Sequence, residues 1–128
     1  MLKHIKNLLE GSAYALAITL TILIIYLSLA STPKIMGIVN ISDKILHLVA
    51  YFVLSLSWFF AVRSSHFQIK SKVGIGILVL ILSVILEFLQ GSFTNYRTAD
   101  YYDIVANTFG IIIALISFRR MLLFYHAI

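Results

Sequence analysis

The chain has no cysteine, a single proline and few charged residues. Without cysteine it forms neither a disulfide nor a thiol-based site. With one proline and six glycines among 128 residues, it is neither a flexible nor a fibrous chain. Charged residues make up only 12% of the sequence, about half the share of a typical soluble domain. The composition therefore disfavours a soluble enzyme, a disulfide-stabilised secreted domain and a nucleic-acid-binding domain.

Apolar residues are abundant instead. They make up 61% of the sequence, and the mean hydropathy is +1.00. A chain of this length is one domain. We therefore predict an all-α, polytopic membrane protein with a single domain over residues 1–128.

Uncharged runs mark four membrane-spanning helices. Crossing the hydrocarbon core takes roughly 20 apolar residues, and no residue from Gly11 to Pro33 is charged. The last two uncharged runs are too short alone, so these helices must take in Glu87 and the aspartates before Ile104. Ionisable groups at that depth normally face the bundle interior or a wet cavity. The predicted helices are a bundle of four at about 11–30, 44–62, 73–91 and 100–119.

The first apolar run has an alternative interpretation. Lys3 and Lys6 followed by apolar residues also resemble a signal peptide, with cleavage after Ala30. The run is longer than the 7–15 residues of a usual signal core. We therefore favour a retained helix.

The basic residues predict the orientation of the bundle. Four helices place both termini on one side of the membrane, and basic residues gather on the cytoplasmic side. Seven lie on the side of the termini (Lys3, Lys6, Arg63, Lys70, Lys72, Arg119, Arg120) and three on the other (Lys34, Lys44, Arg97). We expect cytoplasmic termini, and expect most of the acidic residues at the outer end.

Helical spacing aligns these polar residues. Asp43 and His47 are four residues apart, with Tyr51 one turn deeper, so they share one helix face. Farther along the chain, Ala106, Gly110 and Ala114 repeat every four residues. Small residues at that spacing allow close helix packing in lipid, so the fourth helix is predicted to lie centrally. The predicted site contains eight residues: Asp43, His47, Glu87, Gln90, Arg97, Asp100, Asp103 and Asn107.

Three ordered motifs resemble the VanZ-like family of small multi-pass membrane proteins. Residues 43–51 match D-K-x-x-H-x-x-x-Y, residues 87–90 match E-x-x-Q, and residues 97–110 match R-x-x-D-x-x-D-x-x-A-N-x-x-G. One departure lies at residues 91–96, where family members often carry Pro-Gly before the arginine. The resemblance implies a bacterial inner-membrane protein. The founding member is associated with resistance to the glycopeptide antibiotic teicoplanin, whereas most relatives have no known activity.

The predicted site admits several functions. It could be a structural clasp, with Arg97 neutralising Asp100 or Glu87 and His47 bonded to Asp43. It could bind a ligand, because an arginine holds a phosphate or carboxylate through two hydrogen bonds. An enzyme could use Asp43 to orient His47 as a base, or hold a divalent metal with Asp, His and Glu. A transporter is disfavoured because no inverted repeat is visible.

We favour non-enzymatic binding at the outer end of the bundle, with Arg97 as the anion-binding residue and Asp43 as the residue that orients His47. Tyr96, Tyr101 and Tyr102 could cover a bound molecule or form an interfacial aromatic belt. The expected partners are membrane lipids, and a lipid-linked envelope precursor or a glycopeptide-type amphiphile. We expect no nucleic acid, no cofactor and no metal, because the spacing matches no metal-binding or nucleophile motif.

Overall fold

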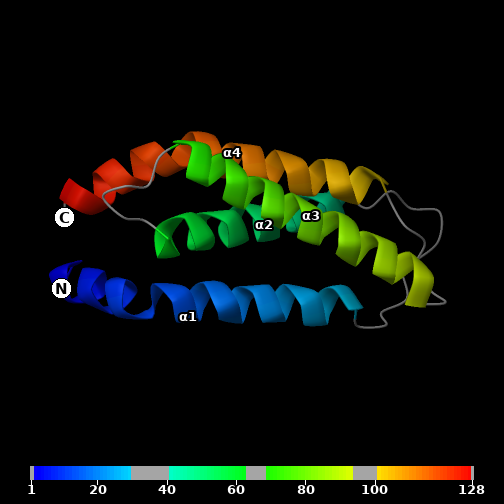
Figure 1. Ribbon diagram of the computed structural model, residues 1–128, viewed down its shortest axis with the longest axis horizontal. Helices are drawn as coiled ribbons and strands as arrows, with labels where there is room; N and C mark the ends of the chain where they lie inside the picture. Colours follow the sequence, from blue (N-terminus) through cyan, green and yellow to red (C-terminus); the bar gives the residue numbers. More distant parts are fainter. Residues whose placement is uncertain (1, 30–40, 63–68, 94–100, 128) are drawn as a thin grey trace.

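The chain folds into four long α-helices. The computed structural model describes residues 2–29, 41–62, 69–93 and 101–127, and no strand occurs within these ranges. The helices are α1 (Leu2–Leu29), α2 (Ile41–Ala61), α3 (Ile69–Phe93) and α4 (Tyr101–Ala127), as Figure 1 shows. Each is long and apolar enough to cross a membrane. The predicted bundle of four transmembrane helices is confirmed, and the chain is a multi-pass membrane protein.

All four helices are longer than the spans predicted from hydropathy, α1 and α4 by the most. α1 begins at Leu2 rather than near residue 11, and α4 continues to Ala127 rather than ending near residue 119. Hydropathy marks the part of a helix that can cross the hydrocarbon core, and a helix can continue beyond that part into the headgroup region. The basic side chains there, including the exposed Lys3, Arg119 and Arg120, suit that region because their charged ends reach water or phosphate.

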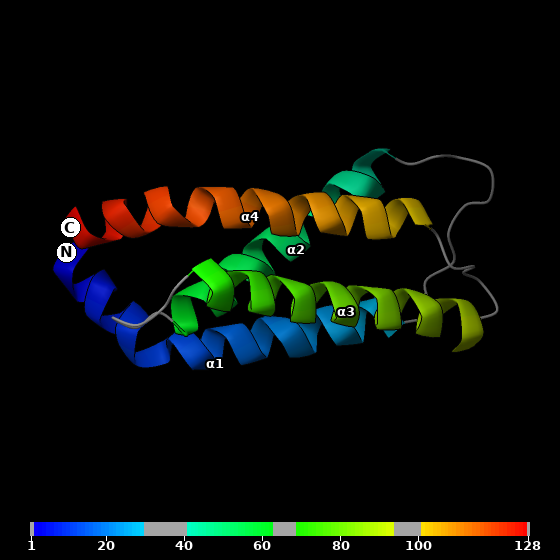
Figure 2. The same cartoon turned by 45° about the horizontal axis from the view of Figure 1, so that its top comes forward.

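The central pair of the bundle is α2 and α4, which pack against each other more extensively than any other two helices. In Figure 2, α2 crosses obliquely between α4 and the neighbouring pair α1 and α3. The spanning segment of α1 is the least buried of the four, and Figure 1 shows α1 along one side of the bundle. α1 is thus peripheral, and α4 is central as the sequence predicts.

A glycine allows α2 and α4 to approach closely. A Cβ atom added at Gly110 would collide with the Leu48 carbonyl oxygen and lie 3.0 Å from the Phe52 backbone nitrogen. Ala106 and Ala114, one turn on either side, are buried. The predicted close-packing face of α4 is therefore confirmed, and α2 is the helix that occupies it.

Apolar packing fills the middle of the bundle. One buried cluster joins Tyr51 and Leu54 of α2 with Val79 of α3 and Ile111 of α4. Farther along, the rings of Phe59 and Phe118 pack edge-on at 5.6 Å between centroids. These contacts hold α2, α3 and α4 together and fix their relative rotation, which positions the polar side chains at one end.

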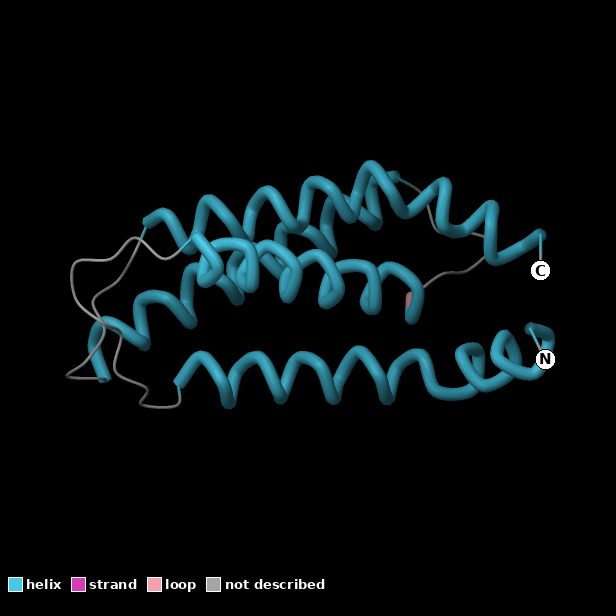
Figure 3. The backbone as a smooth tube through the Cα atoms, turned by 180° about the vertical axis from the view of Figure 1, so that it is seen from behind, coloured by secondary structure: helices cyan, strands magenta, loops and turns pink. Residues whose placement is uncertain are grey.

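Both termini lie at one end of the bundle (Figures 1 and 3). α2 and α4 begin at the opposite end, where α1 and α3 finish. We call this opposite end the polar end, because most of the predicted site residues lie on these helix ends.

Candidate functional site

Polar side chains from three helices meet at the polar end. Each of these side chains contacts at least one of the others, either on the same helix or on a neighbouring helix. We call them the polar cluster, made of Asp43, Lys44 and His47 of α2, Ser83 of α3, and Asp103 and Asn107 of α4. Asp103, Asn107 and Ser83 are buried, whereas the three α2 residues are partly exposed. The cluster thus has a buried floor on α3 and α4 and a rim on α2.

The imidazole of His47 is held by Asn107. The Asn107 carbonyl oxygen Oδ1 lies 3.2 Å from His47 Nδ1, and the Asn107 amide Nδ2 donates a hydrogen bond of 2.7 Å to Ser83 Oγ. A carbonyl oxygen only accepts hydrogen bonds, so this contact suits the form of His47 that carries a proton on Nδ1. Ser83 is also hydrogen-bonded to Tyr51. This chain of contacts fixes the direction in which His47 Nε2 points.

Two carboxylates lie on the Nε2 side of the ring. His47 Nε2 is 3.8 Å from Asp43 Oδ1 and 3.7 Å from Asp103 Oδ2. The predicted alignment of Asp43 with His47 is present, but at this distance there is no direct hydrogen bond between them. The hydrogen bond that orients the imidazole comes from Asn107 on α4, because α2 and α4 approach closely enough for the two side chains to meet.

Lys44 forms an ion pair with buried Asp103. Its Nζ donates a short hydrogen bond to Asp103 Oδ1 and lies 3.9 Å from Asp43 Oδ2. The Asp103 side chain is fully buried and that of Lys44 is 21% exposed. A carboxylate at this depth requires a countercharge, and Lys44 supplies it.

Glu87 and Gln90 lie on α3 beside the polar cluster, and both are buried. The amide of Gln90 donates to the backbone carbonyl of Ser28, which ties the end of α3 to the end of α1. Glu87 interacts electrostatically with Tyr51. Gln90 thus has a structural contact with a peripheral helix, whereas Glu87 contributes a second buried carboxylate near the polar cluster.

The structure brings together most of the predicted site residues. Asp43, His47, Asp103 and Asn107 belong to one cluster, and Glu87 and Gln90 lie beside it. Arg97 and Asp100 lie outside the described residues. The predicted site did not include two members of the polar cluster, Lys44 and Ser83. Ser83 lies one turn before Glu87 and could have been found from that spacing, whereas the pairing of Lys44 depends on how α2 and α4 are rotated.

Exposed apolar and aromatic side chains surround the rim. Tyr101 and Tyr102 at the start of α4 are 83% and 74% exposed. Ile45 and Leu46 on α2 are exposed beside Asp43 and Lys44. Tyrosines at the end of a spanning helix occupy the position of an interfacial aromatic belt. The rim therefore offers charged groups and apolar surface side by side.

The polar cluster contains side chains that bind metals in other proteins. One atom each from Asp43, His47 and Asp103 lies within 4.8 Å of the other two. Carboxylate oxygens and imidazole nitrogens are ligands for divalent cations. The same cluster presents a lysine ammonium group, so it can bind either a cation or an anion.

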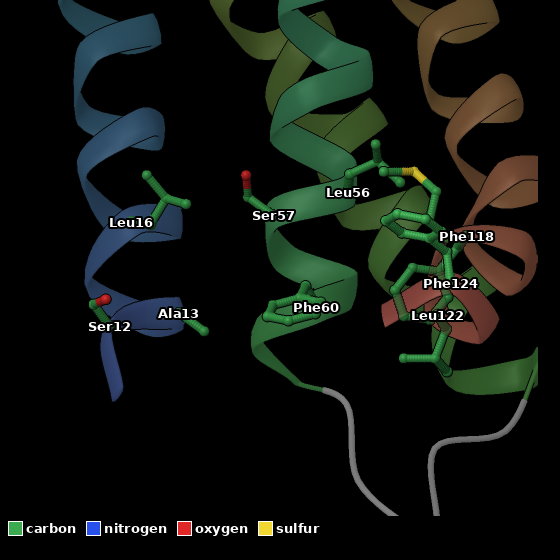
Figure 4. A pocket seen from close by; sticks show the side chains of 10 residues that line it. Ser12, Ala13, Leu16, Leu56, Ser57, Phe60, Phe118, Leu122 and Phe124 are labelled. Atoms are coloured by element: carbon green, nitrogen blue, oxygen red, sulfur yellow. The ribbon is translucent and has the colours of Figure 1, made fainter. Parts of the chain in front are cut away.

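An apolar pocket lies at the other end of the bundle, near the termini. It has a volume of about 320 Å³ and lies between α1, α2 and α4. Figure 4 shows Ser12 and Leu16 of α1 facing Ser57 and Phe60 of α2, with Phe118 of α4 beyond them. Its lining is almost entirely apolar, and none of the polar cluster residues contributes to it.

Comparison with known proteins identifies the family of the chain. The VanZ/LLP1 family matches residues 5–124, which is nearly the whole chain. The chain belongs to the VanZ/LLP1 family. All three motifs that carry the resemblance fall within the matched residues, including the six predicted site residues that the structure describes.

One relative of this VanZ-family chain is from a eukaryote. It is similar to the uncharacterized protein C11E3.10 of Schizosaccharomyces pombe, with 34% identity over 105 residues. The match covers 79% of this chain and 60% of the yeast protein, so this chain spans well under two thirds of that relative's length. No solved structure matches the chain.

Proposed function

We propose that the polar end binds the headgroup of an anionic cell-envelope lipid, such as a lipid-linked sugar precursor. One observation carries the proposal: Asp43, Lys44 and His47 form a partly exposed charged rim over the buried Asp103. The exposed side chains of Ile45, Leu46 and Tyr102 lie on the same helix ends. A binding site for an amphiphile needs both kinds of surface next to each other, because the charged head requires polar partners and the tail requires apolar contacts.

Two roles follow within this proposal. Lys44, and Arg97 from the sequence, bind the anionic group of the lipid, since charge-assisted hydrogen bonds to phosphate are stronger than neutral ones. Asp43, Asn107 and the carboxylates of Glu87, Asp100 and Asp103 bind hydroxyl or amino groups or balance charge. The distribution of basic residues supports cytoplasmic termini, which would turn the polar end toward the outer face of a bacterial inner membrane.

A structural clasp is the second candidate, and a specific observation favours it for part of the site. Gln90 of α3 is bonded to the backbone of α1, and Asn107 of α4 to Ser83 of α3. Such bonds join helices in lipid, where association lacks a hydrophobic driving force. The clasp accounts for Gln90, whereas the contacts of Asp43 with His47 Nε2 at 3.8 Å and Lys44 Nζ at 3.9 Å lie within α2 and join no two helices.

The test is lipid retention by the full chain. The protein is purified from bacterial membranes in mild detergent, and bound lipid is extracted and quantified by mass spectrometry. Substitutions Lys44→Gln and Arg97→Lys should each reduce the retained anionic lipid about tenfold, since a charged hydrogen bond contributes about 1.5–3 kcal/mol. The matched control is Lys3→Gln, an exposed lysine at the other end.

Unchanged lipid retention in both variants would overturn the proposal. Retention of a glycopeptide antibiotic such as teicoplanin in place of a lipid would assign the site to the antibiotic instead. A rise in teicoplanin resistance on expression of the chain, abolished by Arg97→Lys, would connect the site to the role associated with the family's founding member.

A further inference from the structure

Three cation-binding atoms surround one position in the polar cluster. They are Asp43 Oδ1, Asp103 Oδ2 and His47 Nε2, with the imidazole nitrogen 3.8 Å and 3.7 Å from the two oxygens. A charge-assisted hydrogen bond between these groups would be about 2.7–2.9 Å long. The observed separations are almost 1 Å longer, so a proton shared between the ring and a carboxylate does not account for the arrangement.

Lys44 does not occupy this position. Its ammonium group binds Asp103 Oδ1 and approaches Asp43 Oδ2, which are the other oxygens of the same two carboxylates. Each carboxylate thus directs one oxygen to Lys44 and the second toward His47. The ion pair and the three-atom arrangement therefore coexist without competing for the same atoms.

The imidazole is oriented as in a metal ligand. In the neutral ring, a proton on Nδ1 that is directed to the Asn107 carbonyl oxygen leaves Nε2 as the nitrogen with a lone pair. Histidines that bind metals almost always donate their second ring N–H to an oxygen in this way, which fixes the tautomer. Asn107 is itself held by Ser83, so the orientation does not depend on the two carboxylates.

The size of the arrangement fits a metal ion. The three atoms lie within 4.8 Å of one another. An ion in the plane of the three atoms and equidistant from them would lie at most about 2.4 Å from each, and a shift of a few tenths of an ångström gives the 2.0–2.2 Å of zinc bonds to nitrogen and oxygen. The site is also not an exposed acidic patch, since Asp103 is fully buried.

We propose that Asp43, His47 and Asp103 bind a divalent transition-metal ion of the Zn²⁺ or Mn²⁺ class. Two carboxylates and one imidazole form a mixed oxygen and nitrogen ligand set, which suits these ions better than Ca²⁺ or Cu⁺. This proposal departs from the sequence-based expectation of no metal. The ligands come from two helices far apart in the sequence, so no short motif marks them.

The ion would change the charge of the rim. A divalent ion would add two positive charges to the cluster, beside the ammonium group of Lys44. Three protein ligands also leave coordination positions for a further oxygen ligand. The role of the ion in holding an anionic headgroup rests on the proposed function, whereas metal binding itself does not.

The experiment is a Mn²⁺ titration of the chelator-treated full chain in detergent without added lipid, followed by electron paramagnetic resonance. Wild type should bind one Mn²⁺ per chain, and pulsed spectra should show coupling to an imidazole nitrogen. Substitutions Asp43→Asn and His47→Gln should weaken binding at least tenfold. Asn107→Ala, which removes only the support of the ring, should weaken it about 10- to 100-fold. The matched control His4→Gln, at an exposed histidine, should bind as wild type does.

Two results would overturn the proposal without depending on whether a variant folds. One is the absence of stoichiometric Mn²⁺ binding, with Zn²⁺ also failing to bind, by wild-type protein. The other is binding by wild type without nitrogen coupling. If lipid retention still depends on Lys44 and Arg97 in that case, the proposed function stands and only the proposal of metal binding is rejected.

Discussion

Asn107 of α4 lies 3.2 Å from the ring of His47 of α2, and with its other amide atom it donates to Ser83 of α3. One side chain thus connects the three best-packed helices at the level of the polar cluster. The contact requires the close approach of α2 and α4, which Gly110 permits one turn deeper. Local packing and the geometry of the site are therefore coupled.

Substitution of Asn107 by alanine should destabilise the protein by about 1–3 kcal/mol, the usual cost of leaving buried polar partners unpaired. Both His47 Nδ1 and Ser83 Oγ would lose a contact. The measurement is thermal or denaturant unfolding of the detergent-solubilised chain. Thr108→Ala is the matched control, because the Thr108 hydroxyl bonds only to the backbone of its own helix at Ile104. A loss no larger than that of the control would show that Asn107 does not stabilise the bundle.

The sequence predicted which residues share a helix face, but not how the faces meet. The alignment of Asp43 with His47 and the close-packing face around Gly110 follow from helical spacing alone, and both are confirmed. The ion pair of Lys44 with Asp103 depends on the rotation of α2 relative to α4, which a single sequence does not encode in any spacing. The contact of Gln90 with Ser28 depends likewise on where the peripheral helix α1 lies.

The ion pair of Lys44 and Asp103 should be strongly coupled. Removing one partner of a buried pair costs about 3–5 kcal/mol. We expect Lys44→Met to cost more than Asp103→Asn, because Asp103 is fully buried whereas Lys44 is partly exposed and can extend toward the interface. Unfolding free energies of the two single variants and the double variant Lys44→Met/Asp103→Leu measure the coupling.

The double variant should be more stable than the sum of the single effects predicts, because it removes both members of the ion pair and leaves neither without the other. Wild-type stability of the double variant would mean that the ion pair does not stabilise the fold and serves the function of the site instead. Strictly additive losses would contradict the pairing.

Gly110→Ala should destabilise the α2–α4 contact, whereas Gly74→Ala should not. A Cβ at Gly110 meets the backbone of Leu48 and Phe52, which cannot move aside as a flexible side chain can. Overpacking of this kind costs about 1–3 kcal/mol, occasionally more. At Gly74 no atom of the described residues, apart from its own stretch of helix, lies within 4 Å of the added Cβ, so the higher helix propensity of alanine should stabilise by about 0.5–1 kcal/mol. Changes of opposite sign in the free energy of unfolding would confirm the close approach of α2 and α4, and equal stabilisation by both substitutions would contradict it.

The orientation of the bundle can be tested because the chain has no native cysteine. Single cysteines are introduced as Tyr102→Cys at the polar end and Lys3→Cys near the termini, both at exposed positions. The excess of basic residues on the side of the termini predicts that this side is cytoplasmic. A membrane-impermeant maleimide should therefore label Tyr102→Cys but not Lys3→Cys in intact bacterial cells, and should label both after permeabilisation.

The reverse labelling pattern would place the polar cluster in the cytoplasm. The headgroup that the cluster binds would then have to belong to the inner leaflet, and a glycopeptide outside the cell could not reach it without crossing the membrane. Equal labelling of both positions in intact cells would indicate a mixed orientation of the chain in the membrane. Substitution of both Arg119 and Arg120 by glutamine should shift the labelling toward a mixed orientation, because these two residues contribute to the basic excess near the end of α4.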